Sequence, residues 1–173
     1  VSAHGRAQTH KALAGALSRR VEFTLADEAG VVDASVQAWD VQFPALAGHA
    51  TPGAWLVSDA PRAQLLAAAR ALGQASAKTF SAKGGELEVA VSLTHAAGIC
   101  DALLTQKGEP RKFGEKIVGI DQVRLAQDLV LQYNAAHTQH EAWDYQQRMA
   151  RLARVLVAQF ATLKRARGWV DMN

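Results

Sequence analysis

The chain has 173 residues, of which 49% are hydrophobic and 20% are charged, a balance typical of one folded domain that excludes a disordered chain. Its net charge of +3 is too small to indicate a partner by itself. The single cysteine, Cys100, excludes an internal disulfide, so we expect a reducing, cytoplasmic location.

Helices are the element that this composition favours. About a fifth of the residues are alanine, the best helix former, while residues that favour strands are sparse. We therefore expect an all-α fold in which residues 1–173 form a single bundle of four to six helices, with a long C-terminal helical segment. No apolar run approaches the roughly 20 residues that cross a bilayer, so we expect no membrane span.

The N-terminal region has helical periodicity. Residues 1–21 are basic and contain no acid, as in an organelle transit peptide, but they continue into a helical pattern and we expect them to belong to the domain. Apolar residues spaced by four, then by 4-3-4, predict one interrupted helix or two short ones over residues 13–43. Residues 21–25 also alternate as a short strand would, and this alternative stays open.

Two further helices are predicted in the middle of the chain. Pro44, Gly48, Pro52 and Gly53 indicate a loop, after which Ser58–Pro61 predicts a helix start, with the helix ending near Phe80 before Lys83–Gly85. The next helix should end before Lys107–Pro110. We expect its 4-3-4-3 pattern to face the core through Val89, Leu93, Ala96, Cys100 and Leu103.

The last quarter of the chain predicts a long helix, because residues 120–167 contain no glycine and no proline. The side of this helix that carries the apolar residues changes along its length. The first half presents Val123, Ala126, Val130 and Tyr133, whereas the second half presents a stripe about a quarter turn away. We call this second set the apolar stripe: Tyr145, Met149, Leu152, Leu156 and Leu163. Either the helix breaks near residues 137–144, or its two halves pack against different neighbours.

A polar cluster lies where the stripe changes direction. His137, His140, Glu141 and Asp144 have a spacing that can present imidazoles and carboxylates to a metal. The other helices offer no matching carboxylate-histidine motif, so we expect no metal and no cofactor here. In the alternative interpretation the cluster is a solvated bend, with Asp144 paired to Arg148.

Two other patterns fall short of catalytic motifs, and we name no catalytic residue. On one helix, His95 would lie about 140° from Cys100, so the two could not form a hydrogen bond, and Cys100 is expected to pack as a small hydrophobe. The loop Gly108–Gly114 fails the phosphate-loop pattern, although Arg111 and Lys112 could contact phosphates electrostatically.

The basic face of the C-terminal helix is the strongest functional signal, because residues 145–170 hold six lysines or arginines and no acid. Guanidinium groups suit phosphate oxygens, and Trp169 could stack on an unpaired base. The candidate nucleic-acid-binding residues are Arg148, Arg151, Arg154, Lys164, Arg165, Arg167, Arg111, Lys112 and Trp169.

Three functions are compatible with these patterns. The first is a non-enzymatic protein that binds the nucleic-acid backbone without sequence specificity, as a subunit of a nucleoprotein complex with further protein partners. The second is a structural or scaffold bundle that docks a protein partner. The third is a metal-dependent enzyme that uses His137, His140, Glu141 and Asp144; anionic lipid is a weaker variant of the first.

Overall fold

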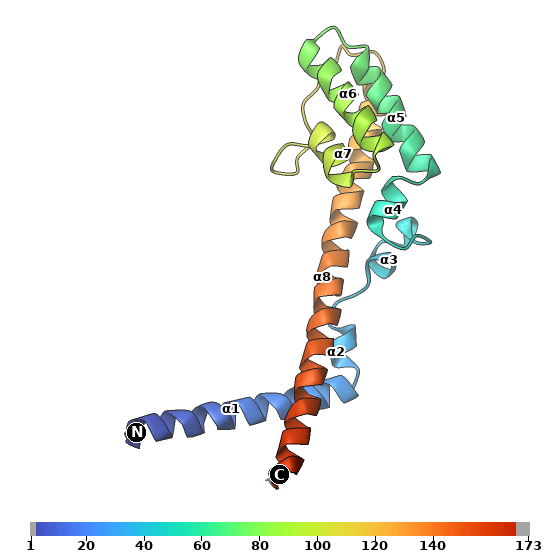
Figure 1. The fold of residues 1–173 in the computed structure, drawn as a ribbon. Helices are drawn as coiled ribbons and strands as arrows, with labels where there is room; N and C mark the ends of the chain where they lie inside the picture. Colours follow the sequence, from blue (N-terminus) through green and yellow to red (C-terminus); the bar gives the residue numbers. More distant parts are fainter. Residues whose placement is uncertain (1–2, 169–173) are drawn as a thin grey trace. The chain divides into compact units, whose positions relative to one another are not determined.

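The computed structural model describes the backbone of residues 3–168 and the side chains of Lys11 and residues 15–168. It is 75% helical, and no β-strand forms among the described residues, which confirms the all-α prediction (Figure 1). Eight α-helices and one short 3-10 helix, η1, lie within residues 3–168. The five α-helices of eight or more residues are α1 (Ala3–Glu28), α5 (Asp59–Gly73), α6 (Lys78–Ser92), α7 (Ala96–Leu103) and α8 (Ile120–Ala166).

The described residues form two compact units, and each is described by itself. The central unit comprises residues 38–141, and the terminal unit comprises the described residues up to 37 and from 142 onward. Helix α8 is continuous, contributing its first part to the central unit and its remainder to the terminal unit. Of the two alternatives for residues 137–144, a break in the helix is wrong, and different neighbours for the two halves are confirmed.

The central unit contains the hydrophobic core. Its short elements α3 (Trp39–Gln42), η1 (Pro44–Leu46) and α4 (Pro52–Leu56) lead into α5, α6 and α7. Ser58 is the N-cap residue of α5, as predicted, with Pro61 buried in the first turn. Fully buried side chains of α4 to α8 form the core: Leu56, Leu65, Leu72, Leu87, Val91, Ile99, Leu103, Val123 and Val130.

Helices α5 and α6 lie side by side (Figure 1), and a glycine sets how closely they approach. A Cβ on Gly84 would lie 2.5 Å from the Gly73 backbone nitrogen and 2.8 Å from the Ala69 carbonyl oxygen. The prediction that Gly84 and Gly85 follow the end of a helix is wrong, because both lie inside α6. Gly84 allows the backbones of α5 and α6 to come into contact, because it has no side chain. The sequence around Gly84 does not reveal this role.

The helix predicted across residues 89–103 is in fact two helices. The chain turns at Thr94, whose φ is 51°, and the His95 backbone N–H donates to the Ala90 carbonyl at 2.9 Å. Helix α6 packs through Leu87, Ala90 and Val91, so Val89 and Leu93 lie on its outer side and are exposed, contrary to the prediction. The turn starts a new helix, in which Leu103 is buried. Ala96 and Cys100 are partly buried and pack against the core.

The segment between α7 and α8 is tied to α8 by one buried amide. Gln127 donates from Nε2 to the carbonyls of Leu103 at 3.0 Å and Arg111 at 2.9 Å. The Arg111 side chain also donates from Nε to the Asp101 carbonyl at 3.0 Å. These bonds hold the basic loop against the core, because a buried backbone acceptor without a donor is costly.

The terminal unit consists of α1, α2 (Val31–Ala34) and the remainder of α8. Residues 21–25 are helical, so the strand alternative is wrong. Gly30 has a φ of 75° and allows the turn that separates α1 from α2, which fits the interrupted helix predicted here. Among the described residues, no helix is long and apolar enough to cross a membrane.

Candidate functional site

The terminal unit buries very little. Every member of the hydrophobic core lies between residues 39 and 136, inside the central unit. Among the described side chains of the terminal unit, only Ala150 and Lys164 are buried. An amphipathic helix gains most of its stability by packing its apolar face, so the position of that face decides what the unit can do.

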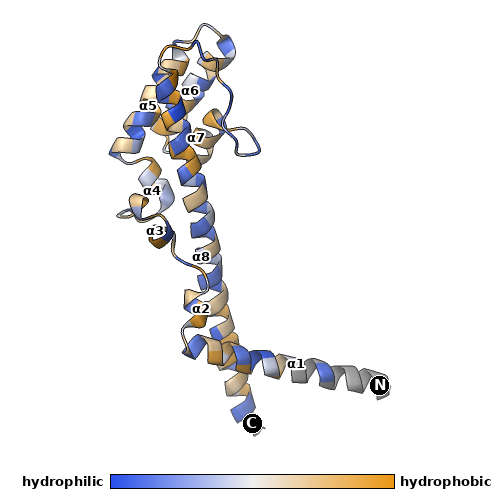
Figure 2. Cartoon of the chain, turned by 180° about the vertical axis from the view of Figure 1, so that it is seen from behind, coloured by the Kyte–Doolittle hydropathy of each residue, from blue (hydrophilic) through white to orange (hydrophobic). Residues whose placement is uncertain are grey.

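The apolar stripe of α8 faces solvent. The exposed fractions are 61% for Tyr145, 38% for Met149, 50% for Leu152, 56% for Leu156 and 54% for Leu163. Val155, beside the stripe, is 51% exposed. Figure 2 shows hydrophobic residues interspersed with hydrophilic ones along this part of α8. Periodicity predicted the stripe, but its exposure is a finding of the structure.

A different side of α8 makes the contacts within the terminal unit. Ala150 and Lys164 are buried there, and Arg154, Val157 and Phe160 are partly buried. At 100° per residue, the middle of this set lies roughly 120° about the helix axis from the middle of the apolar stripe. The helix therefore packs through a narrow, partly charged side and leaves its most apolar side uncovered.

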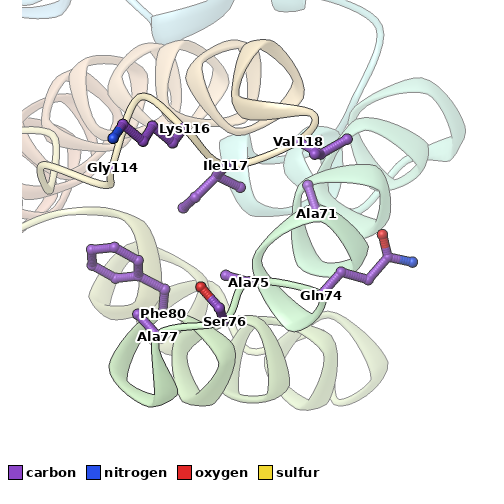
Figure 3. Close-up of a pocket in the computed structure, with 10 residues that line it drawn as sticks. All are labelled: Ala71, Gln74, Ala75, Ser76, Ala77, Phe80, Gly114, Lys116, Ile117 and Val118. Carbon is purple, nitrogen blue, oxygen red and sulfur yellow. The ribbon is translucent and has the colours of Figure 1, made fainter.

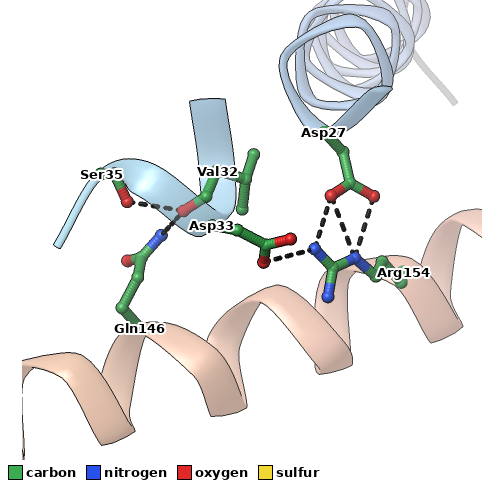
Figure 4. Close-up of polar contacts among 6 residues, drawn as sticks. All are labelled: Asp27, Val32, Asp33, Ser35, Gln146 and Arg154. Carbon is green, nitrogen blue, oxygen red and sulfur yellow. Dashed lines mark hydrogen bonds and ion pairs between the residues drawn. The ribbon is translucent and has the colours of Figure 1, made fainter. Parts of the chain in front are cut away.

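Arg154 is the main polar contact of this packed side (Figure 4). Its Nε lies 2.9 Å from Asp27 Oδ2, its Nη2 bonds Asp27 Oδ1, and the same Nη2 lies 2.9 Å from Asp33 Oδ1. The paired guanidinium lowers the pKa of Asp27, and the two carboxylates raise the pKa of Arg154. A candidate phosphate ligand is thus held in an ion-pair network that joins α8 to α1 and α2.

Further contacts join the same helices. Gln146 donates from Nε2 to the Val32 carbonyl at 3.3 Å, and the Ser35 hydroxyl donates to the same carbonyl at 2.7 Å (Figure 4). The Arg20 guanidinium lies 4.8 Å from the centre of the Phe160 ring, a cation–π arrangement. The Gln146 bond and the Arg20–Phe160 contact thus add polar links between α8 and helices α1 and α2.

The remaining candidates on α8 have different surroundings. Lys164 is buried, and burial and the Arg20 charge lower its pKa, so a surface ligand cannot reach it readily. Arg148 is exposed with its Nε 3.2 Å from Asp144 Oδ2, as the solvated-bend interpretation predicted. Three other arginines are exposed: Arg151, Arg165 and Arg167. Trp169 lies outside the described residues.

The two candidates in the basic loop belong to the central unit. Lys112 is exposed, whereas Arg111 is partly buried and donates to the Asp101 carbonyl. A shallow pocket of about 320 Å³ lies beside this loop, between the end of α5, the start of α6 and residues 114–118 (Figure 3). Three of its ten lining residues are alanines, and Phe80, Ile117 and Val118 add apolar surface. The polar side chains are Gln74, Ser76 and Lys116, so few polar groups could fix a ligand there.

The polar cluster on α8 forms local pairs. His137 stacks on Tyr133 with ring centres 5.4 Å apart, and its Nε2 lies 3.1 Å from Glu141 Oε1. His140 lies edge-on to the buried Trp39 ring. Within the part of the chain that the structure describes, no three His, Cys, Asp or Glu side chains are placed to hold a metal ion.

Cys100 packs against the core, as predicted, and its Sγ donates to Asn134 Oδ1 at 3.4 Å. Burial, with a smaller effect from the Asp101 charge, raises the pKa of the thiol to about 11. His95 precedes α7 instead of sharing a helix with Cys100. A thiol with so high a pKa is a poor nucleophile at neutral pH.

The chain matches no protein-family model, and no curated protein sequence or solved structure is significantly similar to it. The site must therefore be judged on its own geometry.

Sequence reasoning missed the partners of Arg154. Asp27 and Asp33 lie more than a hundred residues away along the chain, so the acid-free stretch from residue 145 to 170 gives no sign of them. Gln127 and Gly84 were missed as well, because a glutamine or a glycine in a helix has no distinctive signal of its own. The exposed side of α8, which carries the apolar stripe, is therefore the candidate functional site.

Proposed function

We propose that this protein is a non-enzymatic scaffold or adaptor that docks a protein partner through the apolar stripe of α8. The observation that carries the proposal is the solvent exposure of all five stripe residues on a helix that is otherwise anchored by polar contacts. Large apolar side chains gathered on one helix side are characteristic of helix-in-groove recognition, in which residues spaced by three and four act as anchors.

The size of the uncovered surface supports docking. Together with Val155, the stripe leaves roughly 500 Å² of large apolar side chains in solvent, at the upper end of the 300–600 Å² patches of typical monomers. The central unit contains the core, so the stripe is not needed to complete it. Tyrosine, methionine and arginine, all present on or beside the stripe, are enriched at protein interfaces.

A photo-crosslinking residue placed at Leu152 tests this proposal in cells that naturally produce the protein. The matched control position is Ala158, which is exposed but lies on the polar side of α8. We expect a covalent adduct with a polypeptide from position 152 and none from position 158. The absence of any adduct from position 152 would overturn the proposal.

Binding to the phosphate backbone of a nucleic acid is a second candidate function, and one observation favours it. Arg148, Arg151 and Arg165 are exposed and fall within about 100° of arc on α8. Their sequence-independent contacts with phosphates would be salt-sensitive. Arg154 and Lys164 are not part of this candidate site, because Arg154 is partly buried between two carboxylates and Lys164 is buried. Arg148 pairs with Asp144 but remains exposed.

Replacing these three arginines with glutamine tests the second candidate on duplex and single-stranded DNA and on RNA of unrelated sequences. Each lost phosphate contact should reduce the slope of log affinity against log salt by about 0.7–0.9. The control is Lys78→Gln, an exposed lysine of the central unit. If the parent protein binds none of these probes at low salt, this candidate function is excluded.

A further inference from the structure

A hollow of about 800 Å³ lies in the central unit, between the loop that follows α7 and the first turns of α8. We call it the loop–α8 hollow. Loop residues 109–115 line one side, and Ile120, Arg124 and Gln127 of α8 line the other. Its volume falls within the range of about 300–1,000 Å³ that is usual for small-molecule sites.

Gln127 is the buried polar residue of this hollow, with an exposed fraction of 6%. Its Nε2 donates to the carbonyls of Leu103 at 3.0 Å and Arg111 at 2.9 Å. These two acceptors fix which amide atom is the nitrogen, so Oε1 is the acceptor that faces elsewhere. No donor among the described residues bonds Gln127 Oε1. Because an unsatisfied buried acceptor is costly, this oxygen favours a ligand that brings a hydrogen-bond donor.

Arg111 is held beside this amide at three points. Its backbone N–H donates to the Leu103 carbonyl at 3.0 Å, its carbonyl accepts from Gln127, and its Nε donates to the Asp101 carbonyl at 3.0 Å. Its two Nη atoms bond no acceptor within the part of the chain that the structure describes. A guanidinium fixed in this way retains two donors suited to a carboxylate.

The remaining charged groups of the hollow have both signs. Lys112, Glu109 and Glu115 are exposed, and none of them forms an ion pair with another described residue. Arg124 is also exposed, and its Nη1 lies 3.8 Å from Asp121 Oδ1, a loose ion pair. Because cations and carboxylates share the lining, its charge does not select a simple anion. It suits a ligand that carries a positive and a negative group.

The apolar part of the lining indicates the rest of the ligand. It consists of Pro110, Phe113 and Ile120. The Phe113 ring is edge-on to Phe80, with ring centres 5.4 Å apart, so packing fixes its position. An apolar group of the ligand would cover this surface and gain free energy by leaving water.

We infer that the loop–α8 hollow binds a free α-amino acid with an apolar side chain. Arg111 and Lys112 bind its carboxylate, and Gln127 Oε1 accepts a hydrogen bond from its ammonium group. Glu109 and Glu115 supply the negative charge that the ammonium group requires. This site is separate from the apolar stripe and adds a small-molecule ligand to the proposed docking function.

NMR titration of the isotope-labelled full chain with L-phenylalanine and L-leucine tests the inference. The signal to follow is the side-chain amide of Gln127, which should shift and saturate as ligand is added. Two analogues of phenylalanine each lack one charged group: phenylpropanoate has no ammonium group, and phenethylamine has no carboxylate. Each should bind at least about tenfold more weakly, because one charge-assisted set of hydrogen bonds is lost.

A pair of lysine variants locates the site. Lys112→Gln should weaken the binding of L-phenylalanine about two- to fivefold, because an exposed charge contributes modestly. The matched control is Lys107→Gln, which removes an exposed lysine of the same loop that does not line the hollow. The control should leave the affinity unchanged. Both side chains are exposed, so folding should be retained.

Three outcomes would overturn the inference. The first is a Gln127 amide signal that neither amino acid moves. The second is binding of phenylpropanoate as tight as that of L-phenylalanine, which would show that the amide oxygen accepts no ammonium donor. The third is an equal loss of affinity in the Lys107 and Lys112 variants, which would place the ligand outside the loop–α8 hollow.

Discussion

Arg154 and Asp27 form a two-pronged ion pair although 127 residues separate them in the chain, with the Arg154 Nε 2.9 Å from Asp27 Oδ2. The exposed fraction is 36% for the Arg154 side chain and 24% for the Asp27 side chain. The pair joins α8 to α1, and Asp33 of α2 bonds the same guanidinium. This network joins all three helices of the terminal unit.

The first prediction concerns the pH dependence of this pair. Hydrogen bonding and attraction from Arg154 lower the pKa of Asp27 below its usual 3.8. Its stabilising effect is therefore fully present above that value and is lost as pH falls through the lowered pKa. In Arg154→Gln, the pKa of Asp27 measured by NMR titration of its carboxyl carbon should rise.

The control for this titration is Arg151→Gln, which removes a neighbouring exposed arginine one helical turn before Arg154. It should leave the pKa of Asp27 unchanged, because Arg151 does not bond that carboxylate in the network described. Equal effects of both variants would mean that general positive charge, and not the observed pair, lowers the pKa.

The second prediction compares two adjacent glycines in α6. Gly84→Ala should lower the free energy of unfolding by about 1–3 kcal/mol, because the new Cβ would clash with backbone atoms of α5. Gly85→Ala has open space and should raise that free energy by up to about 1 kcal/mol through helix propensity. Urea unfolding measures both, and a stabilising Gly84→Ala would contradict the close approach of the two helices.

The third prediction concerns the buried amide of Gln127. Gln127→Leu removes one of two donors to the Leu103 carbonyl, which keeps the Arg111 backbone N–H at 3.0 Å, and removes the Nε2 donor to the Arg111 carbonyl. It should lower the free energy of unfolding by about 1–3 kcal/mol, mainly through the Arg111 carbonyl. The exposed Gln132→Leu serves as the control and should stay within about 0.5 kcal/mol. Equal stability of the two variants in urea unfolding would show that these hydrogen bonds do not hold the loop.

The fourth prediction concerns the reactivity of Cys100. With a pKa of about 11, its thiolate fraction below pH 9 should be about one hundredth of that of an ordinary cysteine. Alkylation by iodoacetamide should therefore be slow in the folded protein and should accelerate as pH rises toward 11. A native protein that reacts as fast as the urea-unfolded chain would disprove the burial of the thiol.

Local signals in the sequence determined much of the secondary structure. The absence of glycine and proline from residues 120–167 predicted a long helix, because nothing in that stretch interrupts backbone hydrogen bonding. Ser58 and Pro61 predicted the start of α5, because residue preferences at the N-cap and in the first turn depend on local backbone geometry, although the Ser58 hydroxyl bonds the Trp55 carbonyl and does not cap the helix. Periodicity likewise identified the apolar stripe as one side of a helix.

Tertiary structure alone decided what those helices face. Gly84 resembles a helix stop in the sequence, but α5 packs against it. Val89 fits a buried pattern in the sequence, but α6 packs through Leu87 and Val91 and leaves it exposed. Arg154 is part of an acid-free stretch in the sequence, yet two carboxylates surround it in space. A periodic pattern gives the direction of a side chain about its own helix, whereas its burial depends on which distant segment packs there.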